Sequence, residues 1–178
     1  MHLAAILNNA PSPHAIGTWR LPRSFRGFSY TSGSFWEHLG RTLERGLFDM
    51  LFFADSFDLH DTYRDSPDTA VRYAVQYPKH DPLPLVPIVG AVTTHLGLGV
   101  TLSTTYLPPY YVARSLATLD HLTEGRVGWN IVTSYGRNEA ANFGLGASDL
   151  SHDERYDRAD EYVDLCRELW ASWDEDAV

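Results

Sequence analysis

Short apolar runs alternate with segments of helical periodicity along almost the whole chain. The runs cover residues 3–7, 47–54, 96–105 and 126–133, a length typical of strands. Between and after them, apolar residues recur at helical spacing in residues 34–47, 109–122 and 151–173. Residues 83–94 predict a further helix that begins near Pro84 or Pro87. The order β-α-β-α-β-α-β-α favours an α/β fold with a parallel sheet and helical crossovers.

Boundary signals support three of the predicted helices. Ser34 stands three residues before Glu37, and Ser151 three residues before Glu154, which is the spacing of a capping box. Gly125 follows the helix that starts at Pro108 and Pro109. The last helix has the clearest apolar stripe, which we expect to be buried: Tyr156, Ala159, Val163, Cys166, Trp170 and Trp173.

Two architectures fit this order: an open doubly wound sheet, or part of a (β/α)8 barrel. In both, ligands bind at the carboxyl ends of the strands. Polar and aromatic residues of this chain follow the strands, as at Asp55, His60 and Tyr135, whereas the opposite turns are simple. Residues 55–81 form a long stretch without clear periodicity, and loops of that length are usually functional. This asymmetry predicts an enzyme site at the carboxyl ends.

The charge distribution excludes some classes of partner. The net charge is −9, and the segment from Ser148 onward, with 11 acidic and three basic residues, carries −8 of it. No basic stripe is present, so we expect no nucleic-acid partner. No apolar run approaches the ~18 residues of a membrane span, and the N-terminus does not resemble a signal peptide. A single cysteine, Cys166, adds to the prediction of a cytoplasmic protein with a free structural thiol.

Several chemistries lack their motifs. The chain has no Walker loop, no G-x-S-x-G elbow and no glycine fingerprint placed between a strand and a helix. Asp55, Asp58, His60 and Asp61 are possible metal ligands close in sequence, so a metal-dependent barrel hydrolase remains an alternative. An inactive truncated copy is another. The main interpretation contains no metal.

Five ordered segments resemble one enzyme family. They are LFFADSFDLHDTYR, DTAVRYAVQYPKHDPL, TLSTTYLPPYYVAR, TLDHLTEGRVGWNIVTS and HDERYDRADEYV. They resemble the bacterial luciferase-like flavin-dependent monooxygenases, in particular the nitrilotriacetate, dibenzothiophene-sulfone and long-chain-alkane type. The resemblance covers essentially the whole chain and implies a (β/α)8 TIM barrel. It also implies reduced FMN as cofactor, delivered by a separate NADH-dependent flavin reductase, with O2 as co-substrate and a small organic molecule as substrate.

The same resemblance implies a role for individual residues. Those expected to bind the flavin are Asp55, Thr101, Ser103, Asn130, His152 and Tyr156. Those expected to act in catalysis are His14, His60 and Tyr135, and Gln76 is expected to line the substrate pocket. One alkane-type member has a histidine where Tyr135 stands and a tyrosine where His60 stands, so its substrate is not carried over to this chain.

The length limits how much of the barrel is present. A (β/α)8 barrel takes typically ~250 residues, whereas this chain has 178 and about four β/α units. We therefore expect residues 1–178 to form a single domain that is the N-terminal half of a luciferase-like barrel. Half a barrel leaves sheet edges unpaired. The sequence thus predicts a homo-oligomer or a poorly soluble chain, and weak FMN binding that residues beyond Val178 would strengthen.

Overall fold

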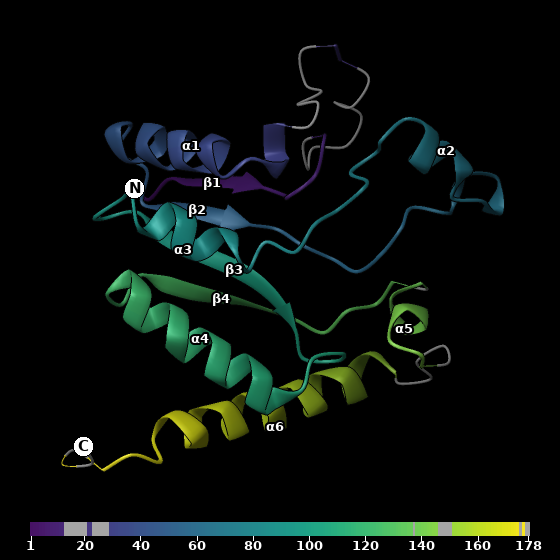
Figure 1. Cartoon of the computed structure of the whole chain (residues 1–178). Coiled ribbons are helices and arrows are strands. Elements are labelled where there is room, and N and C mark those ends of the chain that lie inside the picture. The colour runs from purple at the N-terminus through teal and green to yellow at the C-terminus, as the bar shows by residue number, and fades with distance from the viewer. Residues whose placement is uncertain (13–20, 23–28, 137, 146–150, 175, 177–178) are drawn as a thin grey trace.

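A four-stranded parallel sheet organises the chain (Figure 1). The computed structural model describes residues 1–12, 21–22, 29–136, 138–145, 151–174 and 176. The strands are β1 (Ala4–Leu7), β2 (Met50–Phe53), β3 (Gly97–Ser103) and β4 (Val127–Val132). Each lies inside the run predicted for it, and β2 is the most shortened. The predicted parallel pairing is confirmed, with Ala4 opposite Met50 and Thr101 opposite Asn130.

The strand order distinguishes between the two architectures. Each strand pairs with the next one along the chain, in the order β1-β2-β3-β4, and β1 lies at an edge. In a doubly wound sheet the order reverses beside the first strand, which then lies inside the sheet. Sequential right-handed crossovers instead place all helices on one face, as in a (β/α) barrel. The sheet therefore corresponds to part of a barrel.

Four of the described helices cover one face of the sheet, and α2 (Asp68–Arg72) and α5 (Glu139–Asn142) lie beyond its carboxyl ends (Figure 1). The covering helices are α1 (Gly33–Arg45), α3 (Leu85–Gly90), α4 (Pro109–Thr123) and α6 (His152–Trp170). The shorter elements are η2 (Ser29–Thr31), η3 (Tyr63–Asp65), α2 (Asp68–Arg72) and α5 (Glu139–Asn142). The long stretch 55–81 thus contains two short helical turns, and α5 had no counterpart in the sequence prediction.

One of the two predicted capping boxes forms. The Ser151 hydroxyl accepts from the backbone N–H of Glu154, and the Glu154 carboxylate accepts from the Ser151 N–H at 2.8 Å. The box at Ser34 is wrong, because α1 begins at Gly33 and its N-cap is Ser32, two residues before the predicted one. The Ser34 hydroxyl instead contacts that of Ser32 at 2.7 Å. The predicted end of α4 is confirmed, since Glu124 and Gly125 take the left-handed conformation that closes it.

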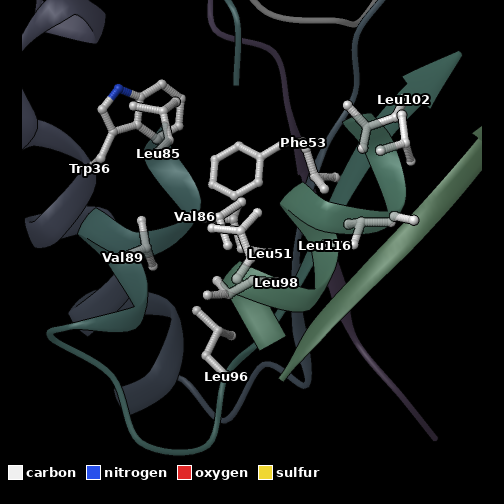
Figure 2. Packing of buried hydrophobic residues seen from close by; sticks show 14 of the residues in the cluster. Trp36, Leu51, Phe53, Leu85, Val86, Val89, Leu96, Leu98, Leu102 and Leu116 are labelled. Carbon is white, nitrogen blue, oxygen red and sulfur yellow. The ribbon is translucent and has the colours of Figure 1, made fainter. Parts of the chain in front are cut away.

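The core lies between the sheet and the helices that cover it (Figure 2). Alternate residues of β2 and β3 point toward the helices, as β-strand periodicity requires. Leu51, Phe53 and Leu98 are fully buried there. Helices α1 and α3 approach closely at Gly40, where a Cβ would lie 2.6 Å from Val89 Cγ1. The labelled side chains of Figure 2 come from α1, β2, α3, β3 and α4, together with Leu96 just before β3.

The apolar stripe of α6 is only partly buried. Ala159 and Cys166 are buried as expected, together with Tyr162, which the predicted stripe omitted. Tyr156 and Trp170 are instead 52% and 41% exposed. Trp173, which the prediction placed on this helix, lies beyond its end at Trp170 and is 76% exposed. The two tryptophans line an open groove of about 1180 Å³ between α4, α6 and β4. Among the described residues, no strand pairs with the outer edge of β1 or of β4.

Two charged side chains tie loops together at the amino end of the sheet. The Glu44 carboxylate accepts from the backbone N–H groups of residues 94, 95 and 96, at 2.6 to 3.1 Å. The Arg126 guanidinium donates to the carbonyls of residues 90, 96 and 123 and to the Thr93 hydroxyl. In the described part of the chain, no helix has both the length and the apolar character needed to cross a membrane.

Candidate active site

A pocket of about 950 Å³ opens at the carboxyl ends of the strands. This is the edge at which parallel α/β proteins bind ligands. Its lining is Asn8, Ala54, Asp55, Ser56, Asp58, His60, Gln76, Lys79, Ile131, Val132, Thr133, Ser134, Tyr135, Gly136, Glu139, Tyr156, Ala159, Asp160, Val163, Asp164 and Arg167. The pocket therefore collects residues from the segments that follow β2 and β4 and from one side of α6.

Asp55 and Lys79 form a partly buried pair of opposite charges in this pocket. Burial raises the pKa of Asp55 to about 7, although the positive charge of Lys79 opposes the rise. Burial also lowers the pKa of Lys79, while Asp55, Asp58 and Glu139 act in the opposite direction. The Lys79 ammonium donates to the Ser56 hydroxyl at 2.6 Å. Near neutral pH, Asp55 can therefore hold or release a proton.

The segment after β2 is held by side chains that follow β4. Asn138 donates to the Leu59 carbonyl and to the Asp61 carboxylate, at 3.2 and 2.9 Å. Glu139 accepts from the Phe57 N–H at 3.0 Å, and Asn142 donates to the Phe57 carbonyl at 2.8 Å. These bonds fix residues 57–61, which include two pocket residues, Asp58 and His60.

Thr101, Ser103 and Asn130 lie on the sheet and do not line the pocket. Thr101 is 5% exposed, and its hydroxyl donates to the Phe53 carbonyl at 2.8 Å and accepts from the Asn130 amide at 3.0 Å. Ser103 is 1% exposed and its hydroxyl lies 2.9 Å from that of Ser134. In this arrangement the hydroxyls of Thr101 and Ser103 link neighbouring strands and the segment after β4.

His152 and Tyr156 lie together at the start of α6. Their ring centroids are 4.7 Å apart, and His152 Nδ1 lies 2.9 Å from the Asp153 carboxylate. Both residues are exposed, and only Tyr156 lines the pocket. Of the two acidic residues here, Glu154 is engaged in the capping box, and its hydrogen bonds from Ser151 lower its pKa.

The pocket brings together half of the residues expected to form the site. Asp55, His60, Gln76, Tyr135 and Tyr156 line it, with the Tyr135 side chain 89% exposed at its mouth. Thr101, Ser103, Asn130 and His152 do not line it, and His14 lies outside the described residues. Their roles stay predictions.

Sequence reasoning missed Lys79 and Glu139, which both line the pocket. Lys79 carried one available signal, since it is the only lysine in the chain. No sequence pattern pointed to Glu139, because its partners are the backbone N–H groups of Phe57, in a distant segment, and of Gly136, in a neighbouring one.

The four residues considered as metal ligands do not converge. Asp61 accepts from Asn138, and Asp58 packs against Gly136. Over the described ranges, no group of three or more His, Cys, Asp or Glu side chains could hold a metal ion. The geometry thus gives the hydrolase alternative no support.

Comparison with curated proteins shows that this chain is similar to enzymes named monooxygenases. It is 49% identical over 179 residues to dibenzothiophene-sulfone monooxygenase of Rhodococcus erythropolis (strain XP), covering 100% of this chain and 39% of that protein. It is 38% identical to nitrilotriacetate monooxygenase component A of Aminobacter aminovorans, covering 90% of this chain and 36% of that protein. The chain therefore spans about two fifths of the length of these relatives.

Solved structures give the same result. A long-chain alkane monooxygenase matches with a TM-score of 0.93 and 49% identity, over 100% of this chain and 41% of that one. A riboflavin lyase, solved with modified FMN and riboflavin, matches with a TM-score of 0.86 and 33% identity, over 96% of this chain and 38% of that one.

The family model described as luciferase-like monooxygenase matches residues 31–177, which includes β2 to β4 and the whole of α6. The sequential parallel sheet agrees with the barrel of that family. The resemblance read from the five sequence segments is thereby confirmed, and the chain belongs to the luciferase-like monooxygenase family.

Proposed function

We propose that this chain is the N-terminal half-barrel, a single domain over residues 1–178, of a two-component FMNH2-dependent monooxygenase. A separate NADH-dependent reductase supplies the reduced flavin, and one oxygen atom of O2 enters a small organic substrate. The observation that carries the proposal is the convergence of Asp55, His60, Gln76, Tyr135 and Tyr156 on one pocket, in a member of this family.

The pocket is suited to a flavin in size and chemistry. Its volume of about 950 Å³ lies in the range of small-molecule and cofactor sites, roughly 300–1,000 Å³. Apolar residues such as Ile131 and Val132 line one part of it, and the polar groups of Asp55 and Gln76 another. An isoalloxazine ring needs both kinds of surface. The riboflavin lyase with its modified FMN supports the choice of flavin.

Reduced FMN, when bound, would supply the electrons that activate O2. The chain's own residues would bind the flavin and handle protons. Asp55, with a pKa raised by burial to about 7, can hold a proton at its carboxyl group or release it near neutral pH. His60, Gln76 and Tyr135 can donate hydrogen bonds to an oxygen-bearing group in the pocket. Exclusion of water around the bound flavin would limit the loss of oxygen as peroxide.

The remaining predicted flavin residues fit secondary positions. Thr101, Ser103 and Asn130 would support the flavin site from the sheet, because their side chains link adjacent strands or the segment after β4. We assign His152 and Tyr156 to the phosphate end of the flavin, since their rings lie side by side where α6 begins. His14 is assigned to catalysis on the family resemblance.

Two further aspects concern the surroundings of the enzyme. The name nitrilotriacetate monooxygenase component A refers to one component of a system, which supports a separate reductase as partner. The buried free thiol of Cys166 is compatible with the reducing cytoplasm, where we place the protein.

Oxygen uptake tests the proposal. The natural polypeptide that carries these residues is mixed with a flavin reductase, NADH, FMN and O2, and a panel of sulfones, alkanes, sulfides and aminopolycarboxylates is screened. We expect at least one substrate to increase product formation and decrease the fraction of oxygen released as peroxide. His60→Ala should raise that peroxide fraction, whereas His38→Ala, on the exposed side of α1, should not. Substrate-independent oxygen uptake across the whole panel would contradict the proposal.

A further inference from the structure

The segment after β2 depends on α5 for its conformation. Residues 57–61 belong to no helix or strand, so their backbone polar groups need partners from elsewhere. Three side chains of one short stretch supply them: Asn138, Glu139 and Asn142 bind the Leu59 carbonyl, the Phe57 N–H and the Phe57 carbonyl. These contacts span about 80 residues of sequence, so they fix the segment relative to β4.

Glu139 occupies the centre of this set of contacts. It is 3% exposed, and each of its carboxylate oxygens has its own backbone donor. Oε1 accepts from the Phe57 N–H at 3.0 Å, and Oε2 accepts from the Gly136 N–H at 2.8 Å. Hydrogen bonds to a charged acceptor are about twice as strong as neutral ones. The Glu139 carboxylate therefore bonds to the backbone of both segments, after β2 and after β4.

The segments after β2 and β4 pack closely at Gly136, against the side chain of Asp58. A Cβ at Gly136 would lie 2.7 Å from Asp58 Cγ and 3.0 Å from Glu139 Cγ. On the other side, the Phe57 ring lies 4.8 Å from that of Phe143, edge to face. Since a four-residue helix such as α5 is not stable alone, these side-chain contacts stabilise both segments at once.

We propose that Glu139 is a positioning residue that fixes the wall of the pocket formed by Asp58 and His60. It acts through the Phe57 N–H, which belongs to no helix or strand and directly precedes Asp58 in the sequence. The importance of this wall for flavin binding rests on the proposed function. The fixing of residues 57–61 does not, since it follows from the hydrogen bonds alone.

Glu44 provides a matched control at the opposite end of the sheet. Its carboxylate also accepts from loop N–H groups, those of residues 94–96, and does not line the pocket. Glu139→Gln and Glu44→Gln remove the same charge at two places. Glu139→Gln also puts an amide NH2 group where a carboxylate oxygen accepts a hydrogen bond, whereas the one accepting oxygen of Glu44, Oε1, can persist as the amide oxygen. If Glu139 only stabilises the fold, both variants should change the affinity for reduced FMN to the same extent.

Hydrogen exchange in the flavin-free protein is the first measurement, made on the full natural chain. In Glu139→Gln we expect exchange to accelerate about tenfold or more in peptides covering residues 56–62 and 134–143. In Glu44→Gln we expect acceleration only around residues 93–97. If residues 56–62 exchange at the wild-type rate in Glu139→Gln, the proposal is wrong. Should that variant not fold, Asn142→Ala removes a neighbouring contact with Phe57 and makes the same comparison.

Anaerobic titration with reduced FMN is the second measurement. We expect Glu139→Gln to weaken binding about tenfold or more, because the displaced wall no longer matches the ligand, and Glu44→Gln to stay near wild type. Equal weakening in both variants would overturn the positioning role. If the wild type binds no reduced FMN, the proposed function fails, and the exchange comparison alone decides the role of Glu139.

Discussion

Asp55 gives the protein a pH-dependent stability that one substitution should abolish. The carboxyl group lies in the pocket beside Lys79, and burial raises its pKa from 3.8 to about 7. In the unfolded chain the same group ionises near pH 4. Between these values, the folded protein binds a proton that the unfolded chain has already lost. Asp55→Asn keeps the size of the side chain and removes its titration.

The sign and size of the effect follow from proton linkage. Because the folded pKa is raised, the stabilisation is fully present below about pH 4 and is lost as the pH rises toward 7. At about 1.4 kcal/mol per pKa unit, the complete loss is about 4 kcal/mol. Roughly 2–3 kcal/mol of it falls between pH 5 and pH 8. From pH 5 to pH 8, the free energy of unfolding of Asp55→Asn minus that of the wild type should therefore increase by this amount.

Urea denaturation of the flavin-free protein at pH 5, 6, 7 and 8 measures this difference. Asp157→Asn, on the exposed side of α6, is the control, and it should follow the wild type at every pH. The reasoning is refuted if the difference between Asp55→Asn and wild type stays constant from pH 5 to 8. A constant difference would mean that Asp55 is already ionised in the folded protein at pH 5, which is the opposite of what its burial predicts.

Four further predictions follow from individual contacts. Arg126→Leu should lower the free energy of unfolding by about 2–4 kcal/mol, measured by urea denaturation, because it leaves buried carbonyls at the amino end of the sheet without their donor. Ser151→Ala should cost about 1 kcal/mol through loss of the capping box, measured by thermal unfolding; an unchanged midpoint would contradict that role. Cys166 is fully buried and burial raises the pKa of its thiol, so a disulfide reagent at pH 8 should label it rapidly only after denaturant is added. In light scattering after size exclusion, the isolated 178-residue chain should assemble or precipitate, since β1, β4 and the groove beside α6 leave apolar surface open; a stable monomer that binds FMN tightly would contradict the half-barrel proposal.

Local chemistry in the sequence determined the four strands, the main helices and some of their ends. The four apolar runs became β1 to β4, and the spacing of Ser151 and Glu154 gave a capping box, because both depend on residues a few positions apart. The placement of polar residues after the strands also located the site, since parallel strands bring their carboxyl ends to one edge. Where two serines competed for one helix start, local pattern failed: α1 took Ser32 as its N-cap and left the Ser34 pattern unused.

Pairing between distant segments decided the rest. Sequence periodicity was equally compatible with a doubly wound sheet, and only the hydrogen-bonded order β1-β2-β3-β4 distinguished the barrel. The raised pKa of Asp55 depends on how much of the chain surrounds it, and the partners of Glu139 include the Phe57 N–H, 82 positions away. The sequence could name Asp55 as a site residue, but its proton affinity and its neighbours Lys79 and Glu139 exist only once the segments after β2 and β4 meet. Burial and long-range hydrogen bonding arise only when these two segments pack against each other, and no local pattern encodes them.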